Sequence, residues 1–188
     1  MATITGTSGN DTLIATATGG DTLIGGKGSN ILVSGPGNDT LDGSGGIDTA
    51  DYNGATGPVT VNLALGTAFG SGVGSDTLIR IEKVSGSNYA DTLIGDAYDN
   101  VLYGGNGNDT LTGGGGYDTF AVMSGGKGDT STDTITDFTI GGIVGGKGSS
   151  YERIQMPTNI FTNYTSGSNP FSSGYARLTP SGADTVME

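Results

Sequence analysis

Single apolar positions recur at nine-residue intervals along two stretches of the chain. In each repeat an acidic or amide residue stands two places before the apolar one, most often with threonine between them. Glycine-rich segments separate the repeats and favour tight turns, because glycine readily adopts positive φ. The pattern predicts three-residue strands joined by turns, with one apolar side chain of each strand pointing inward. These inward residues are Leu13, Leu23, Leu32, Leu41, Leu93, Leu102, Leu111 and Phe120.

The repeats fall into two blocks. The first reads GGKGSNILV, SGPGNDTLD and GSGGIDTAD over residues 25–51, and the second reads GSNYADTLI, GDAYDNVLY, GGNGNDTLT and GGGGYDTFA over residues 86–121. Asp21 continues the first block in phase, whereas Asp11 lies one residue out of phase, which implies an extra residue near Ala15. Two repeats make one coil, so residues eighteen apart stack about one strand spacing from each other.

This stacking brings like charges together. It pairs Asp21 with Asp39, Asn30 with Asp48, Asp91 with Asp109, and Asn100 with Asp118. Two carboxylates about 5 Å apart repel by roughly 1 kcal/mol in water, and by several times more at a partly buried site. A thin layer of leucine offsets this repulsion poorly, whereas a hard dication between the rows reverses it. Calcium fits between these rows of carboxylates, because it accepts about six to eight oxygen ligands, including backbone carbonyls, in flexible geometry.

Residues 6–51 and 71–121 resemble the nonapeptide G-G-x-G-x-D-x-U-x of repeats-in-toxin (RTX, hemolysin-type calcium-binding) proteins. The resemblance implies an all-β fold, a parallel β-roll (β-solenoid) with two calcium-binding repeat blocks, a β spacer and a β-rich C-terminal cap. We expect the first block at residues 1–51, the spacer at 52–85, the second block at 86–125, and the cap, a secretion-target-like region, at 126–188.

In this family each ion lies between turns two repeats apart and is held by turn carbonyls and by the Asp of each turn. The resemblance therefore implies four ligand sets: Ala17, Gly19 and Asp21 with Ser34, Pro36 and Asp39; Gly26, Gly28 and Asn30 with Gly43, Gly45 and Asp48; Ser87, Tyr89 and Asp91 with Gly104, Asn106 and Asp109; and Asp96, Tyr98 and Asn100 with Gly113, Gly115 and Asp118. Asp11 is a further ligand. Asn30 and Asn100 replace the usual Asp, and Tyr89 and Tyr98 stand where the family has glycine. We expect about four to eight calcium ions.

Residues 52–85 interrupt the repeat. Val59, Val61, Leu63 and Leu65 alternate with polar or small residues and predict a half-buried strand. A turn-like segment follows at 70–79, in which Asp76 is either another calcium ligand or a surface carboxylate.

After Ala121 the repeat pattern ends. Asp129, Asp133 and Asp137 are spaced four apart, which fits one helix face, but the threonine and isoleucine between them favour a strand. The late aromatic residues predict a β-rich cap over the open end of the roll; they are Phe161, Tyr164, Phe171 and Tyr175.

Composition narrows the function classes. The chain carries 19 acidic and 7 basic residues, a net charge of −12, so nucleic acid and anionic membranes are poor partners. It has no cysteine for a disulfide framework and no histidine for acid–base catalysis or a zinc site. G-x-S-x-G and H-E-x-x-H motifs are absent, as is any apolar run long enough to span a membrane. We therefore expect that the chain is not an enzyme and that bound calcium, in place of disulfides, stabilises its fold.

The expected function is that of a secreted structural protein, such as a surface-layer, matrix or secretion-linked module, that folds on binding extracellular calcium. Type I secretion machinery is the expected partner, with self-association or cell-surface attachment outside the cell. Two alternatives stay open. One is the C-terminal calcium-binding module of a larger extracellular enzyme, such as a protease, lipase or epimerase, and the other is an adhesin or ice-binding roll. The start at Met1 favours a complete short protein.

Overall fold

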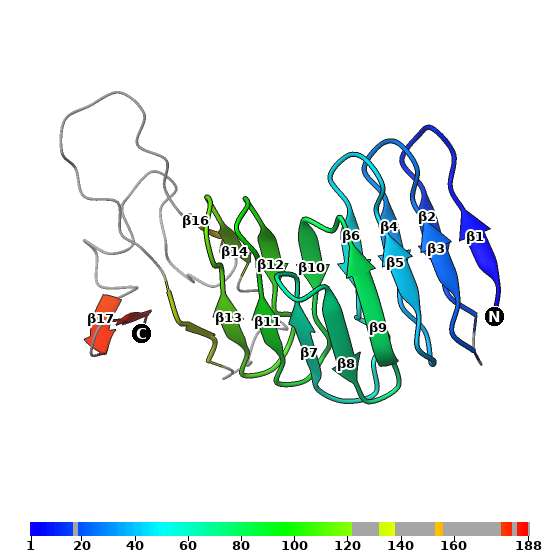
Figure 1. Ribbon diagram of the computed structural model, residues 1–188. Coiled ribbons are helices and arrows are strands. Elements are labelled where there is room, and N and C mark those ends of the chain that lie inside the picture. The colour runs from blue at the N-terminus through cyan, green and yellow to red at the C-terminus, as the bar shows by residue number, and fades with distance from the viewer. Residues whose placement is uncertain (17–18, 122–131, 138–152, 156–177, 182–183, 188) are drawn as a thin grey trace, which may run out of the picture.

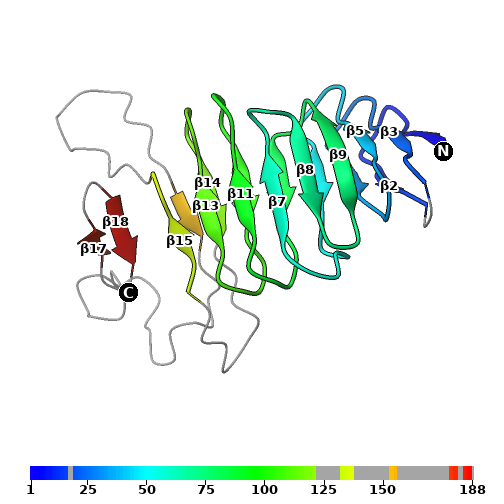
Figure 2. The same ribbon diagram turned by 60° about the horizontal axis from the view of Figure 1, so that its bottom comes forward.

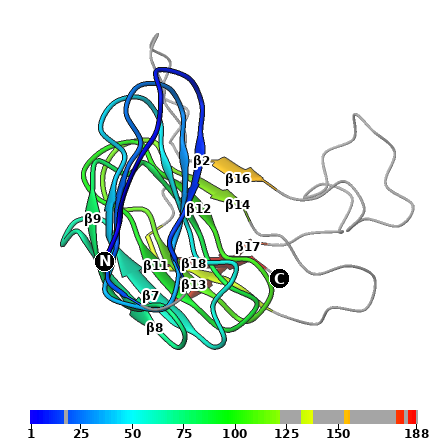
Figure 3. The ribbon, with the colours of Figure 1, turned by 90° about the vertical axis from the view of Figure 1, so that its right-hand side faces the viewer.

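The computed structural model describes residues 1–187 apart from 17–18, 122–131, 138–152, 156–177 and 182–183. The described residues form strands and turns and contain no helix. Short strands follow one another along the length of the molecule, with the N-terminus at one end (Figure 1). In the end view the coils lie one behind another (Figure 3). Successive strands alternate between two sheets within each repeat block, so the fold is a parallel β-roll, as predicted.

The two sheets run through both repeat blocks and through residues 52–85 between them. The first contains, in spatial order, β1 (Thr3–Thr5), β3 (Thr22–Ile24), β5 (Thr40–Asp42), β9 (Gly74–Ile79), β8 (Thr67–Gly70), β7 (Val59–Asn62), β11 (Thr92–Ile94), β13 (Thr110–Thr112) and β15 (Thr134–Ile135). The second contains β2 (Thr12–Ile14), β4 (Ile31–Val33), β6 (Thr49–Asp51), β10 (Lys83–Ser85), β12 (Val101–Tyr103), β14 (Thr119–Ala121) and β16 (Arg153–Gln155). β17 (Leu178–Ser181) and β18 (Asp184–Met187) form a separate antiparallel pair.

The strand register confirms the coil length and the phase shift. Leu23 pairs with Leu41, eighteen residues on, whereas Leu13 pairs with Leu32, nineteen residues on, because one extra residue lies in the connection between β2 and β3. All eight predicted inward residues are buried, and in the strand register each lies opposite an apolar residue of the neighbouring coil, as Leu93 does opposite Leu111. Within the repeat blocks the core is therefore one row of side chains per sheet, which gives little apolar area per residue to stabilise the fold, and Tyr52 and Val73 add buried surface in the spacer.

The spacer corrects one sequence prediction. Val59 and Val61 are buried in β7, but the strand ends at Asn62, and Leu65 is 74% exposed. The Asn62 side chain accepts the N–H of Leu65, and Gly66 follows with φ +65°, so the chain turns back there instead of continuing.

The segment at 70–79 was expected to be turn-like, and this is wrong for most of it. Only residues 71–73 connect β8 to β9, which covers Gly74–Ile79 and pairs parallel to β5. Figure 2 shows β7, β8 and β9 side by side in one sheet. The strand forms because Thr77 and Leu78 repeat the Thr-Leu pair of β5 and bury the leucine in the same row.

Beyond β14 the structure describes residues 132–137, 153–155, 178–181 and 184–187. β15 confirms the preference for a strand at Thr134–Ile135. Asp129 and the cap aromatics Phe161, Tyr164, Phe171 and Tyr175 lie outside the described residues. Within the part of the chain that the structure describes, no helix is long and apolar enough to cross a membrane.

Candidate metal centre

The turns of successive coils lie directly on one another, and this packing requires glycine. Gly46 has a φ of +135°, and a Cβ at this position would overlap the carbonyl oxygen of Gly28 one coil earlier. Gly107, with φ +124°, lies over Tyr89 in the same way. Side chains are excluded from these contacts both by the backbone conformation and by space. Main-chain carbonyls of one turn therefore reach the backbone of the next turn.

Position six of the turns forms two ladders of stacked side chains. The first ladder contains Asp21, Asp39 and Asp76 and, beyond the inserted strands β8 and β7, Asp91, Asp109 and Asp133. The second ladder contains Asp11, Asn30, Asp48, Glu82, Asn100 and Asp118. In most steps the main-chain N–H of one residue donates to a side-chain oxygen of the next. These distances are 2.7 Å for Asp21 to Asp39 and Asn30 to Asp48, 2.8 Å for Asp39 to Asp76, Asp48 to Glu82 and Asp91 to Asp109, 2.9 Å for Asn100 to Asp118, 3.0 Å for Asp11 to Asn30, and 3.1 Å for Asp109 to Asp133.

Asp109 shows what the second oxygen of a ladder carboxylate does. Its Oδ1 accepts the N–H of Asp91, whereas its Oδ2 is buried and accepts no hydrogen bond among the described residues. This Oδ2 lies so close to Gly104 that a Cβ there would collide with it. The carbonyl oxygen of Ser87, from the preceding coil, lies against Gly105 in the same turn. Carbonyl and carboxylate oxygens are the ligands that calcium prefers, so the residues of this turn fit a calcium ion.

The burial of these carboxylates is unfavourable without a cation. Burial raises the pKa of Asp109 to about 7, and the neighbouring charges of Asp133 and Asp91 add to the effect. Burial also raises the pKa of Asp76 to about 6, although hydrogen bonds from Asp39 and Ser34 oppose it. A bound dication would remove this penalty, because it favours the charged form of both groups.

Three ladder residues instead receive hydroxyl donors from their own turn. The hydroxyl and N–H of Thr16 and the N–H of Ala2 donate to Asp21, and they hold its pKa at about 2. Thr7 makes the corresponding two contacts with Asp11, and Ser87 makes them with Asp91. These are the first carboxylates of a ladder or of a repeat block. No earlier coil of the same repeat block precedes these carboxylates, and hydrogen-bond donors of the protein contact them instead.

The structure brings together the turns that the four ligand sets pair. Gly45 donates its N–H to the carbonyl of Gly26 at 2.9 Å, and Gly115 donates to Asp96 at 2.7 Å. In the third set the carbonyls of Ser87 and Tyr89 lie against the turn that contains Gly104 and Asn106. In the first set the carbonyl of Gly19 lies against the turn of Ser34 and Pro36, whereas Ala17 lies outside the described residues.

Asp76 is a full member of the first ladder. It is 3% exposed, so the alternative of a surface carboxylate is wrong. Its Oδ1 accepts the N–H of Asp39, and its Oδ2 accepts the hydroxyl of Ser34 at 2.8 Å.

Two ladder members were missed by the sequence analysis. Glu82 accepts the N–H of Asp48, and Asp133 accepts the N–H of Asp109. Both precede a polar residue and then an apolar one, in Glu82-Lys83-Val84 and Asp133-Thr134-Ile135, as in the repeats. This short pattern would have identified them, but neither follows a glycine-rich hexapeptide, and Glu82 is one methylene longer than Asp.

Side chains alone do not make these sites. In the described parts of the chain, no three Asp, Glu, His or Cys side chains gather into a group that would hold a metal ion. Each paired turn offers at most two position-six carboxylates, and calcium needs about six to eight ligands. An ion between two stacked turns would therefore need main-chain carbonyls for most of its coordination.

Fold and site together define a parallel β-roll whose stacked turns present oxygen ligands to hard cations. Residues 3–17, 16–50 and 85–120 match the family model of the RTX calcium-binding nonapeptide repeat. These matched segments carry RTX-type calcium-binding repeats, and this repeat family is a structural, non-catalytic module. The matched segments leave residues 51–84 between them, where the sheet inserts β7 and β8. A comparison with curated proteins gives no match.

Proposed function

We propose that the chain is a secreted structural module whose folding is driven by calcium outside the cell. The observation that carries this proposal is Oδ2 of Asp109, a buried carboxylate oxygen that accepts no hydrogen bond among the described residues and faces a carbonyl-lined turn. An ion at this place would satisfy the oxygen and cancel the repulsion along the ladder. Binding of calcium and folding are then one event.

The proposed ions lie between turns one coil apart. Each is held by turn carbonyls and by the two position-six residues, in the four sets Asp21 with Asp39, Asn30 with Asp48, Asp91 with Asp109, and Asn100 with Asp118. Asp76 adds a place for a fifth ion, because it stacks on Asp39 as Asp39 stacks on Asp21. About six dications would neutralise the net charge of −12, within the expected range of four to eight.

Folding that depends on calcium is compatible with secretion of the unfolded chain. At low cytosolic calcium the thin core and the stacked charges favour the unfolded chain, which fits a narrow type I secretion channel. Extracellular calcium, at roughly millimolar concentration, exceeds typical constants of about 10⁻⁴ to 10⁻³ M for extracellular sites, so the roll folds on arrival. Binding to the native state alone then stabilises it by mass action.

A calcium titration followed by far-ultraviolet circular dichroism tests the proposal. We expect a cooperative transition from disorder to β-structure, reversal by chelator, and little response to magnesium at the same concentration, since magnesium demands a smaller octahedral site. A spectrum already β-rich in metal-depleted buffer and unchanged by calcium would overturn it.

A further inference from the structure

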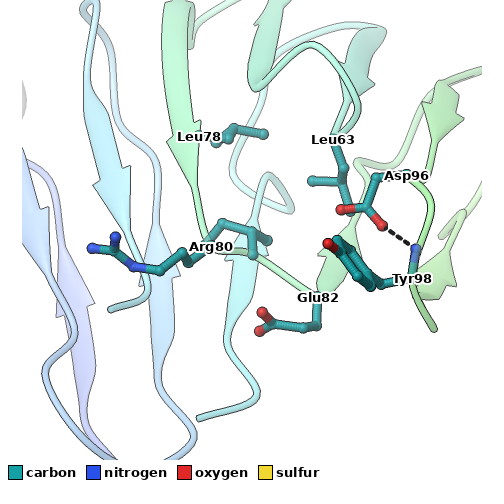
Figure 4. A pocket seen from close by; sticks show the side chains of 7 residues that line it. Leu63, Leu78, Arg80, Glu82, Asp96 and Tyr98 are labelled. Atoms are coloured by element: carbon teal, nitrogen blue, oxygen red, sulfur yellow. Dashed lines mark hydrogen bonds between the residues drawn. The ribbon is translucent and has the colours of Figure 1, made fainter. Parts of the chain in front are cut away.

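A cavity of about 270 Å³ opens beside the second ladder, at the boundary between the spacer and the second repeat block. Figure 4 shows it between the connection at Arg80–Glu82 and the turn that carries Asp96 and Tyr98. The four calcium ligand sets use the main chain of this turn, and apart from Glu82, a member of the second ladder, the side chains around the cavity have no role in them.

The cavity exists because one connection is shortened. On this side of the roll the connections between the sheets contain six residues, at 25–30, 43–48, 95–100 and 113–118, whereas only residues 80–82 join β9 to β10. The first sheet also inserts β8 and β7 between β9 and β11, while in the second sheet β10 lies directly beside β12. The short connection therefore does not fill the space in front of the next full turn.

The lining combines an apolar floor with carboxylates. Leu63, Leu78 and Ile81 contribute aliphatic surface, and the last two are almost fully buried. Glu82 uses Oε2 to accept the N–H of Asp48, and Asp96 uses Oδ1 to accept the N–H of Tyr98 at 2.8 Å. Both residues line the cavity, and in Figure 4 the carboxylate of Asp96 lies between Leu63 and Tyr98.

The one cationic residue of the lining is turned away from it. Arg80 has a left-handed backbone, φ +52°, and its guanidinium makes two contacts with the carboxylate of Asp42, at 2.6 and 2.7 Å. In Figure 4 this side chain extends away from Glu82 and Asp96. The cavity therefore keeps the charge of two carboxylates, in a protein that is already strongly acidic.

A calcium ion fits this cavity poorly, because three aliphatic side chains occupy positions where about six to eight oxygens would be needed. A cation with an apolar stem fits better. Its stem would pack on the leucines, and its charge would meet Glu82 and Asp96. Tyr98 is 75% exposed and offers a ring face on which a planar guanidinium stacks.

We propose that this cavity receives a single arginine side chain of a partner polypeptide. The inference rests on the proposed function, because the cavity forms only when the roll is folded. The interaction gives the roll a specific, charge-selected contact at the spacer, separate from the calcium-binding turns.

The test uses the whole protein in saturating calcium and two tripeptides, acetyl-Gly-Arg-Gly-amide and the same peptide with citrulline, which keeps the shape and removes the charge. Heteronuclear NMR follows the amides. We expect the arginine peptide to shift resonances of residues 63, 80–82 and 96–98 in a saturable way, and the citrulline peptide to bind several-fold more weakly. Equal binding of the two peptides, or shifts spread over both ladders, would overturn the proposal, as would loss of binding when calcium is raised above saturation.

Matched variants refine the test. Asp96→Asn keeps the hydrogen bond to the turn and removes the charge, and Tyr98→Ser removes the ring; each should weaken arginine binding about two- to fivefold. Tyr117→Ser, an exposed tyrosine one coil further on, should have no effect. Circular dichroism in calcium shows that each variant folds. A chain that folds with calcium and ignores the arginine peptide contradicts this inference alone, whereas a chain that fails to respond to calcium contradicts the proposed function.

Discussion

The main-chain N–H of Asp39 donates a hydrogen bond of 2.8 Å to Oδ1 of Asp76, although 37 residues separate them. In the regular repeats the same bond joins residues eighteen apart, such as Asp21 and Asp39. The ladder therefore continues directly from β5 to β9, although β6, β7 and β8 lie between them in the sequence. Beyond β9, the strands β8 and β7 separate Asp76 from Asp91, and the N–H of Val59 in β7 donates to Asp91 in place of a ladder residue. A spacer can be inserted in the sequence because the next acidic residue with a Thr-Leu pair resumes the register.

Asp76→Ala should destabilise the calcium-loaded protein by about 2 kcal/mol. The substitution leaves the N–H of Asp39 and the hydroxyl of Ser34 without their acceptor in a buried place. Urea unfolding in saturating calcium measures the loss. The control is Asp51→Ala, whose carboxylate accepts the exposed N–H of Asn53; it should cost less than about 0.5 kcal/mol. Equal losses in the two variants would show that Asp76 has no special place in the ladder.

Asp109→Asn should weaken folding in the presence of calcium and favour folding in its absence. Asn keeps an oxygen to accept the N–H of Asp91 but removes a buried charge. In calcium it should raise the midpoint of the folding titration several-fold, because one anionic ligand is lost. In metal-depleted buffer it should increase the residual β-structure, because the repulsion along the ladder is relieved.

Asp99→Asn is the control for Asp109→Asn, since Asp99 is exposed in a turn of the same block and its Oδ1 accepts the N–H of Tyr117, which Asn would also accept. It should leave the calcium midpoint nearly unchanged. A loss of stability from Asp109→Asn in both conditions would mean that its carboxylate is held by the protein and not by an ion.

The pH dependence of the metal-free chain should be the reverse of the usual acid denaturation. The folded pKa values of Asp109, about 7, and Asp76, about 6, lie above the ordinary value of 3.8. Between pH 7 and about 4 the folded state thus binds more protons than the unfolded state, and the free energy of unfolding rises as the pH falls. Circular dichroism in metal-depleted buffer should show β-structure appearing over this window.

The calcium-loaded protein should lose stability over the same pH window, because protons compete with the ion for the carboxylates. Asp21 behaves differently: with its pKa lowered to about 2, it contributes stability that is lost only as the pH falls below 3.8. Stability that falls with acid in the absence of metal would contradict the burial of unneutralised carboxylates.

Gly46→Ala should cost about 1–3 kcal/mol in calcium, because Gly46 has φ +135° and a methyl group would overlap the carbonyl of Gly28. Gly54→Ala is the matched control, since nothing lies within 4 Å of the position where its Cβ would be. Thermal unfolding followed by circular dichroism compares the two. Similar melting temperatures would mean that the turns are not stacked as closely as described.

The fold was predictable because the repeat carries its own register. One apolar residue per strand and one acidic residue two places earlier determine which side chains stack, so the pairs such as Asp91 with Asp109 followed from counting. The phase shift after Asp11 was also visible, and the register of Leu13 with Leu32 confirms the extra residue.

The spacer was harder to predict, because its contacts depend on tertiary pairing. Leu65 continued an alternating pattern and is exposed, since Asn62 and Gly66 turn the chain first. Glu82 lacked the glycine-rich turn that marks the other ladder members, so its place in the stack became visible only when β10 was seen beside β6. The roles of the turn carbonyls as ligands stay predictions.

The most direct measurement is a crystal structure of the calcium-loaded protein with anomalous scattering data collected at a wavelength where calcium contributes. We predict anomalous peaks between turns one coil apart, among them one bounded by Oδ2 of Asp109 and the carbonyls of Ser87 and Tyr89, at oxygen distances of about 2.3–2.6 Å. Well-ordered turns without anomalous density, in a protein folded equally well in chelator, would contradict calcium as the agent that folds the roll.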